Sequence, residues 1–374
     1  MLGMKSDRVR VRHFGGLMGY MHKIAAIMRI APYLLARDVA PGILLRRLQL
    51  PPSLLLEEQV WVDRYTSLLL SQEIVRATGD PLAGLHVAQL IRFSDYGDWG
   101  EGIVKSRTLL DAFRFACREI TRIETGTRVQ LHQDQKHAHV SFELIGDIET
   151  DPRQFIEASL LVLRKIIDLA TEAVPTRAFL PHASIHGLDL EPLFGPQLEF
   201  QAVRAELVFD RDALRLPLHP PEPPDVMLTA SRSHAVHDTA RHVMAALQET
   251  ISFERPTARA TAAALSINVR MMQRQLSSWG VTFEDLLDQY RRRAALEYLI
   301  AGEHSITGIA FRLGYSDSAH FTRAFRRWTG NSPRDALKSF AAPRAVPGRS
   351  RTRQLQRMSP RSEALDEEAV PWAS

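Results

Sequence analysis

Residues 269–279 carry side chains of the types and spacing needed to read base pairs. The polar residues fall at positions i, i+3, i+4 and i+7 of one helix face: Arg270, Gln273, Arg274 and Ser277. The apolar residues are spaced for the opposite face: Met272, Leu276 and Trp279. Arginine can bond both major-groove acceptors of guanine, glutamine can pair with adenine, and either can hold a phosphate. We therefore expect this helix to lie in the major groove of DNA.

A second segment, residues 317–328, repeats the arrangement. Its outward residues are expected to be Ser318, Thr322, Arg323 and Arg326. Its packed stripe is expected to be Phe321, Ala324, Phe325 and Trp328. Seven residues from these two faces are the candidate DNA contacts: Arg270, Gln273, Arg274, Ser318, Thr322, Arg323 and Arg326.

Each candidate helix follows a short apolar helix and a tight turn, at residues 262–268 and 309–316. Asn268 and Ser316 are the expected N-caps, which completes the layout of a helix-turn-helix. One such unit is weak support, because a helix with a basic face is commonly only a solvated surface. Here the apolar helix 283–301 joins two copies and can pack against both, which favours an all-α domain with two helix-turn-helix units.

The second unit also carries a family resemblance. The run from Ser305 to Pro333, which includes Gly314-Tyr315-Ser316, closely resembles the signature of AraC/XylS-type transcription regulators. The resemblance covers residues 235–340 and implies two helix-turn-helix subdomains on a rigid connecting helix, entering successive major grooves. The family's base-contacting positions fall on residues that the face analysis also selects: Arg270, Gln273, Arg274, Ser318, Thr322 and Arg323.

The first unit departs from the family in its turn. Ser266 stands where the family usually has glycine, and Asn268 where serine is the common cap. Asparagine caps a helix as well as serine does. Serine strains the turn if its φ angle is positive, because only glycine adopts that conformation without steric cost.

The sequence pattern of the N-terminal half predicts an α+β domain. Long amphipathic helices are expected at 59–78, 108–123 and 152–171. Two alternating runs, 128–132 and 137–144, are expected to pair as strands. Shorter extended pieces follow at 177–180, 198–200 and 206–209.

This half has a weaker resemblance to the arabinose-binding-like sensing domain of one branch of the same family. The segments that carry it are Thr78–His86, Trp99–Gly102 ahead of Thr108–Phe113, and Leu193–Gly195 followed by Leu198–Phe200. The resemblance implies a module that responds to an effector and self-associates.

The domain limits follow from composition. We expect a flexible arm at 1–20, a sensing and dimerisation domain at 21–215, a proline-rich linker at 216–234, a DNA-binding domain at 235–340 and a disordered tail at 341–374. Because a proline-rich spacer carries few tertiary contacts, cutting the chain within 217–224 is expected to give two soluble pieces, and the 225–340 fragment is expected to bind DNA.

Charge is distributed unevenly over the 374 residues, whose formal net charge is +4. Residues 231–340 contain 15 Lys and Arg against 10 Asp and Glu, whereas the residues before 231 contain 26 against 29. Excess positive charge in the paired motif suits phosphate neutralisation. A single cysteine, Cys117, excludes an internal disulfide, and no run approaches the length of a membrane span. We expect a cytoplasmic protein that does not contact a membrane.

Fourteen histidines invite a search for metal or acid–base chemistry. His132, His137 and His139 lie on or beside the expected hairpin without a further ligand, and no His-Glu-x-x-His spacing exists. There is no phosphate-binding glycine motif and no Gly-x-Ser-x-Gly nucleophile turn. The sequence therefore predicts no catalytic residue, no metal and no cofactor, and the protein is not expected to be an enzyme.

The leading interpretation is a regulator that binds double-stranded promoter DNA and responds to a small-molecule effector of unknown identity. A homodimer is expected, and RNA polymerase is a further candidate partner. In the alternative interpretation the N-terminal domain only dimerises or binds a protein partner, without a ligand. A third interpretation, an N-terminal enzyme fused to a DNA anchor, requires convergent acidic and nucleophilic groups in that domain.

Overall fold

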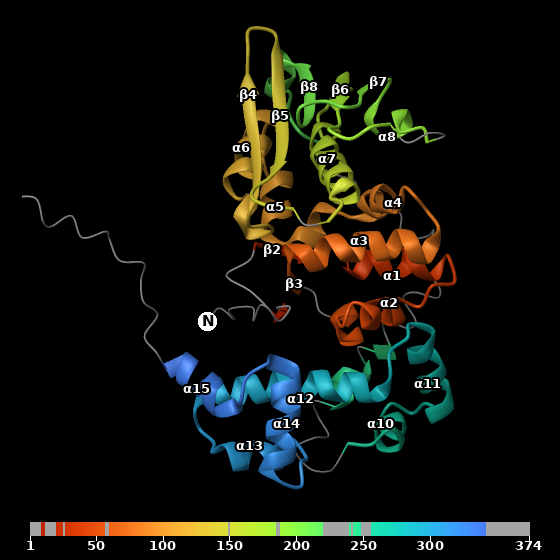
Figure 1. Cartoon of the computed structure of the whole chain (residues 1–374), viewed down its shortest axis with the longest axis vertical. Helices are drawn as coiled ribbons and strands as arrows, with labels where there is room; N and C mark the ends of the chain where they lie inside the picture. Colours follow the sequence, from red (N-terminus) through yellow and green to blue (C-terminus); the bar gives the residue numbers. More distant parts are fainter. Residues whose placement is uncertain are drawn as a thin grey trace, which may run out of the picture.

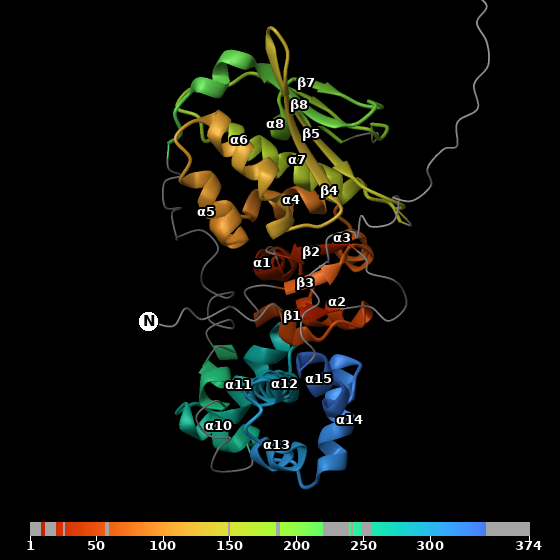
Figure 2. The same ribbon diagram turned by 90° about the vertical axis from the view of Figure 1, so that its left-hand side faces the viewer.

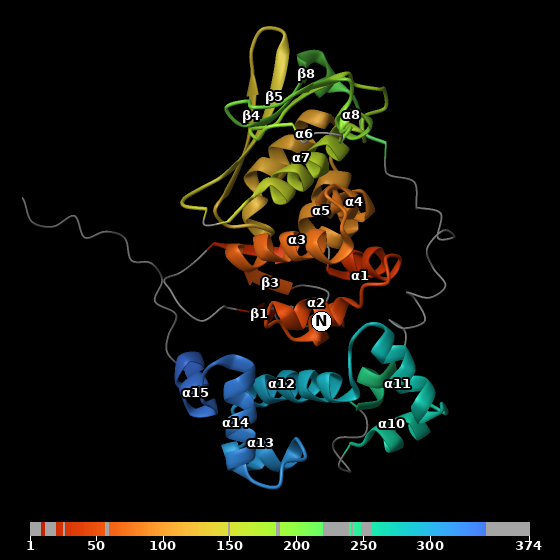
Figure 3. The ribbon, with the colours of Figure 1, turned by 45° about the vertical axis from the view of Figure 1, so that its right-hand side comes forward.

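The protein is arranged in three tiers along its long axis (Figures 1 and 3). A five-stranded sheet with its helices lies at one end, a smaller helical layer around α3 lies in the middle, and the C-terminal helices form the other end. The computed structural model describes residues 9–11, 20–24, 27–56, 60–148, 150–184, 188–219, 239–240, 242–247 and 256–341.

The sheet of the first tier has the strand order β4-β5-β8-β6-β7. All its neighbouring strands are antiparallel except β6 and β7, which are parallel. The strands are β4 (Thr127–Gln133), β5 (His137–Leu144), β6 (Thr176–Phe179), β7 (Gln197–Glu199) and β8 (Ala205–Asp210). The paired strands and the later extended pieces expected from the sequence are confirmed.

Strand alternation buries one face of this sheet. Val129 lies opposite Phe142 in the register of β4 and β5, and both side chains are buried. The buried face packs on α6 (Leu109–Arg118) and α7 (Arg153–Ile167), as Figure 2 shows. This packing forms the larger hydrophobic core of the N-terminal domain.

The middle tier holds a three-stranded sheet of order β1-β3-β2 and most of the remaining N-terminal helices. Its strands are β1 (Val9–Val11), β2 (Met21–Ile24) and β3 (Val60–Asp63). The longer helices around it are α1 (Ile27–Leu35), α2 (Pro41–Arg47), α3 (Arg64–Thr78) and α4 (Ala83–Leu90), whereas α5 (Asp98–Val104) packs on α6 in the core of the first tier. Short helices complete the domain: η1 (Pro52–Leu56), η2 (Phe93–Tyr96), η3 (Ile120–Arg122), α8 (Glu191–Phe194) and η4 (Arg211–Arg215).

Three expected helices are shorter than the sequence predicts. The helix expected from residue 59 begins only at Arg64, because the buried run 60–62 is the central strand of the small sheet and Asp63 caps α3 by accepting from the Thr66 N–H. The helix expected to end at 123 ends at Arg118, and the one expected to reach 171 ends at Ile167. Part of the expected flexible arm, Val9–Val11, pairs in parallel with β3, and the other residues before 20 lie outside the described part of the chain.

The C-terminal tier is helical throughout its described residues. Its elements are α10 (Ala258–Ala264), α11 (Val269–Ser278), α12 (Phe283–Ala301), α13 (Ile306–Arg312), α14 (Ser318–Thr329) and α15 (Pro333–Ala341). α10 and α11 lie at one end of α12, and α13 and α14 at the other (Figures 1 and 3). The two helix-turn-helix units on a connecting helix are therefore confirmed.

The two halves share a hydrophobic core, which the few tertiary contacts expected of the linker did not predict. Leu44, Leu45 and Leu54 of the N-terminal domain share one hydrophobic cluster with Trp279 of the first helix-turn-helix unit and Leu286 of α12. The start of the expected linker also packs on the N-terminal domain, since Leu218 forms a bridge with Ala170. Residues 220–238, where the rest of the linker and the start of the expected DNA-binding domain fall, lie outside the described residues, as does the tail after 341.

The turns of the two helix-turn-helix units have the same backbone geometry. In the first, the N–H groups of Ser266 and Ile267 donate to the carbonyls of Ala263 and Ala262. In the second, Gly314 and Tyr315 donate to residues 311 and 310. The φ angle is +54° at Ser266 and +75° at Gly314, so the serine adopts the strained left-handed conformation that its sequence position suggested.

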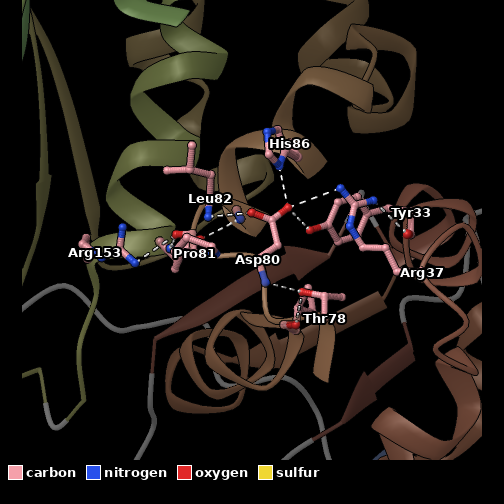
Figure 4. A network of polar contacts seen from close by, with 11 residues as sticks. Tyr33, Arg37, Thr78, Asp80, Pro81, Leu82, His86 and Arg153 are labelled. Carbon is pink, nitrogen blue, oxygen red and sulfur yellow. Dashed lines mark hydrogen bonds and ion pairs between the residues drawn. The ribbon is translucent and has the colours of Figure 1, made fainter. Parts of the chain in front are cut away.

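In the middle tier, the carboxylate of Asp80 accepts several hydrogen bonds from neighbouring elements (Figure 4). Its Oδ2 accepts hydrogen bonds from the Tyr33 hydroxyl at 2.6 Å and from Arg37 at 3.3 Å, and lies 2.6 Å from Nδ1 of His86. Its Oδ1 accepts from the N–H of Leu82. Burial raises the pKa of Asp80, but the bonds from Tyr33, His86 and Leu82 outweigh burial and hold the pKa below its usual value. One carboxylate thus ties α1 to the start of α4.

Replacing Asp80 by Asn should lower the free energy of unfolding by about 2 kcal/mol at pH 7, because charge-assisted hydrogen bonds are lost. A depressed folded pKa stabilises the fold above the unfolded value near 3.9, and this contribution disappears as pH falls through the folded pKa. Urea unfolding should therefore show the two proteins converging below about pH 4. Asp98→Asn, at a carboxylate 85% exposed, is the control and should have little effect at either pH.

Replacing Ser266 by Gly should stabilise the chain by up to about 1 kcal/mol, because glycine adopts positive φ without steric cost. The gain is partly offset by the larger entropy of an unfolded chain containing glycine. Thermal unfolding of the full chain measures it. Ser277→Gly, within the right-handed helix α11, should instead destabilise. A loss of stability in both variants would contradict the strained turn.

Candidate nucleic-acid interface

The predicted contact residues of the first unit lie together on the open face of α11. Arg270, Gln273 and Arg274 are all exposed, as is Ser277 one turn later. Met272 and Leu276 on the opposite face are buried in the cluster shared with the N-terminal domain. The helix thus offers guanidinium and amide groups to solvent from a fixed backbone.

The predicted residues of the second unit differ in exposure. Arg323 and Arg326 are exposed on α14, whereas Ser318 and Thr322 are half-buried. The Thr322 hydroxyl donates to the carbonyl of Ser318 at 2.7 Å, so it is already engaged within the helix. The two arginines are therefore the more available donors of this helix.

The two units differ by one residue between turn and recognition helix. Met272 follows Ser266 by six positions, whereas its buried counterpart Phe321 follows Gly314 by seven. Aligned on these core positions, Arg270 corresponds to the exposed Ala319. Ser318 lies one position before Ala319, in the first turn of α14, and so falls outside the face that corresponds to the polar face of α11.

The extra residue also changes the cap of the second helix. Asn268 caps α11, as the sequence predicts, by accepting from the N–H of Arg270 at 2.8 Å. The predicted cap Ser316 is wrong, because Asp317 caps α14 and accepts from the N–H of His320 at 2.8 Å. That hydrogen bond holds the pKa of Asp317 below its ordinary value. His320, which is exposed beside this cap, was not selected from the sequence.

Side chains of α12 hold the second unit in place. Arg291 donates from Nε to the carbonyl of Leu313 at 2.9 Å, and its guanidinium lies 4.6 Å from the ring centre of Tyr315. Arg327 of α14 forms an ion pair with Asp288. These contacts fix both the turn and the recognition helix relative to α12.

The length of α12 suits two neighbouring major grooves. Its 19 residues span about 28 Å at 1.5 Å per residue. The first unit packs near Phe283 and Leu286, and the second near Ala294 and Leu299, so the units sit at its two ends. One turn of B-DNA is about 34 Å, which is comparable with this separation.

A cluster of buried polar groups lies in the N-terminal domain where β2 meets residues 123–127. His22 is 2% exposed, stacks on Phe155 and forms a backbone bridge with Glu124. Burial and the charge of Arg64 lower the pKa of His22 to about 3, and burial raises the pKa of Glu124 to about 7. Both ring nitrogens of His22, and Nε and Nη1 of Arg64, have no hydrogen-bond partner among the described residues.

These atoms need polar partners, because buried donors left unsatisfied are costly. Ordered water or polar atoms of a small molecule could supply them.

A separate surface pocket of about 460 Å³ lies at the C-terminal end of α7, lined by Arg164, Ile167, Asp168, Ala170, Thr171, Glu172, Ala173, Val174 and Pro175.

The histidines of the β4–β5 hairpin engage neighbouring carboxylates. His139 lies 3.1 Å from Asp134 and 3.8 Å from Glu206, on the same strand face as His137. Within the described ranges, no group of three His, Cys, Asp or Glu residues is placed to hold a metal ion.

Burial raises the pKa of the Cys117 thiol to about 11. None of the helices in the described residues is long and apolar enough to cross a membrane.

Comparison with known proteins identifies both parts of the chain. Residues 39–218 match the arabinose-binding domain found at the N-terminus of AraC transcription regulators, and residues 261–339 match a helix-turn-helix domain. The ornithine utilization regulator of Pseudomonas aeruginosa is 26% identical over 268 residues, which are 69% of this chain and 78% of that protein. The transcriptional regulator VqsM of the same organism is 35% identical over 92 residues, 25% of this chain and 28% of its own.

Among solved structures, the regulator CdpR from Pseudomonas aeruginosa matches 73% of this chain and 91% of its own, at 20% identity and a TM-score of 0.34. That score is too low to support an argument, so the assignment depends on the two domain matches and on the paired helix-turn-helix geometry. The chain belongs to the AraC-type DNA-binding transcription regulators, with an N-terminal domain of the arabinose-binding class.

Proposed function

We propose that this regulator reads promoter DNA with α11 and α14 in two successive major grooves on one face of the duplex. The observation that carries the proposal is the placement of two exposed polar helix faces at the two ends of α12. The length of the connecting helix is comparable with one turn of DNA, and the positive charge of residues 231–340 favours the phosphate backbone.

The exposed side chains suggest a division of roles. Arg270, Arg274 and Arg323 can each make a bidentate contact with guanine, and Gln273 can pair with adenine. Arg326 lies one turn after Thr322 and can reach either a base or a phosphate. Ala319, which takes the place of Arg270 in the second unit, fits contact with a thymine methyl group.

Replacing Arg323 by Ala should weaken binding to the preferred site by about 1 to 3 kcal/mol and relax discrimination at one base position. The preferred site is first obtained by in vitro selection with the full chain, and binding is then measured at fixed salt. Arg293→Ala is the matched control, because Arg293 is 62% exposed on α12 and pairs with Glu297. An equal loss on unrelated DNA would assign Arg323 to a phosphate.

Exchanging Gln273 should alter preference about 10 base pairs away from the Arg323 position, since the helices enter neighbouring grooves. Protection of only one short region in a footprint would refute the two-groove arrangement.

We also propose that the N-terminal domain binds a small-molecule effector and that the protein acts as a homodimer. The match to an arabinose-binding domain supports a ligand, and the buried donors around Arg64 suit a molecule with a carboxylate or other acceptor. A relative named for ornithine utilization makes amino acids reasonable first compounds to test. In the alternative, the domain only dimerises or binds a protein such as RNA polymerase.

An effector that binds the folded chain should raise its melting temperature, by the equivalent of about 2.7 kcal/mol at a hundredfold excess over Kd. We expect this shift for a carboxylated compound in a metabolite library that includes ornithine, and no shift for neutral hydrocarbons. Light scattering on the same samples reports dimerisation. A strictly monomeric chain with no thermal shift across the library would favour the protein-partner alternative.

A further inference from the structure

Helix α2 connects the N-terminal domain to the first helix-turn-helix unit. It lies between α3 and the C-terminal helices in all three ribbon views (Figures 1, 2 and 3). The N–H of Gly42 donates to the carbonyl of Trp279 at 2.7 Å. Arg46 donates from Nη1 to the carbonyl of Gly280 at 2.6 Å and from Nη2 to Asp285 at 2.7 Å. These contacts of Gly42 and Arg46 therefore lie in the segment that joins α11 to α12 and in the first turn of α12.

The backbones approach so closely that only glycine fits at Gly42. A Cβ atom there would lie 2.3 Å from the carbonyl oxygen of Gly280 and 2.8 Å from that of Trp279. Gly280 has a φ angle of +68°, which also favours glycine. Glycine is a poor helix former, so its presence within a seven-residue helix is consistent with a requirement for this contact.

The contact between α2 and residues 279–280 lies beside buried apolar side chains that also form the core of the first unit. Leu44 and Leu45 of α2 belong to the same buried cluster as Trp279, which is 2% exposed. The cluster of the second unit contains only C-terminal residues among those described. Of the two units, the first is thus the one that shares a hydrophobic core with the N-terminal domain.

The recognition face stays open while this contact is made. Arg270, Gln273 and Arg274 are exposed in the same structure in which Arg46 holds the end of α11. The contact therefore restrains the recognition helix without covering the groups that read DNA.

We propose that Arg46 and Gly42 are positioning residues, through which α2 sets the place of the first recognition helix relative to the N-terminal domain. A shift of α2 would then change how α11 is placed relative to α14, and so the fit of both helices to one DNA site. Loss of the contact removes a restraint on the end of α11 beyond its packing on α12, and the helix must then be positioned fully only when DNA binds, which weakens binding. The inference rests on the proposed two-groove reading of DNA.

The test uses the full chain and the DNA site selected by the unchanged protein. Arg46→Ala should weaken binding about fivefold or more, the range typical of coupling between sites. Base changes in the part of the site read by α11 should then matter less, while those in the part read by α14 keep their effect.

Arg47→Ala is the matched control. Arg47 follows Arg46 in the same helix, its side chain is 52% exposed against 43%, and it pairs with Glu73 of the N-terminal domain at 3.0 Å. It should leave DNA binding within twofold of the unchanged protein. Equal affinity of both arginine variants and the unchanged protein would overturn the proposal.

Gly42→Ala provides an independent measurement, since alanine favours the helix and any loss must come from the blocked approach. We expect weaker DNA binding together with a red-shifted fluorescence component from Trp279 as it becomes exposed. Unchanged binding and unchanged emission would contradict the proposal. If the unchanged protein selects no two-part DNA site, the proposed two-groove reading of DNA is wrong. If it selects such a site and the variants bind that site normally, only the positioning role of α2 is wrong.

Discussion

The packing of α12 against both helix-turn-helix units is the interaction on which the DNA-reading arrangement depends. Its first turns bury Phe283 and Leu286 beside the first unit, and its last turns bury Ala295 and Leu299 beside the second. A rigid helix of fixed rise converts these two apolar contacts into a fixed separation. Neither recognition helix could be placed on DNA by its own residues alone, because the place of each relative to the other depends on this shared support.

The N-terminal domain is joined to this support by a series of packed elements. Lys165 of α7 donates to the carbonyls of Ala88 and Gln89 at the end of α4, and Asp80 ties the start of α4 to α1. Helix α1 packs on α2, which contacts the first unit. Each link is a specific polar bond or a buried cluster, so packed contacts run without interruption from α7 to the first unit.

The sequence predicts the C-terminal domain better than the N-terminal one, for physical reasons. Helix periodicity is expressed over many residues, so the limits of α12 follow directly from its apolar spacing. The segment 60–62 misleads because a short buried strand and a buried helix have the same continuous apolar composition. The strain at Ser266 could be anticipated because the family usually has glycine at this position, and the φ angle there is positive.

Features that depend on distant residues escaped prediction. The contact between Gly42 and Gly280 joins positions far apart in the chain, and neither glycine has a periodic or charged neighbourhood that marks it. The same holds for the bond from Arg291 to the carbonyl of Leu313, since an arginine on a helix is ordinarily a solvated residue. On the polar face of α14, Thr322, Arg323 and Arg326 match the face of α11 when the buried residues are aligned, and only Ser318 falls one position outside it.

That single additional residue before α14 matters for attempts to engineer new specificity. One residue rotates a helix face by about 100°, so a set of base-reading side chains grafted from α11 onto α14 by counting from the turn would point away from the groove. Grafting must instead keep the register of Met272 with Phe321 and of Leu276 with Phe325. The buried residues, and not the turns, therefore fix the alignment that must be used when base-reading side chains are transferred between the two recognition helices.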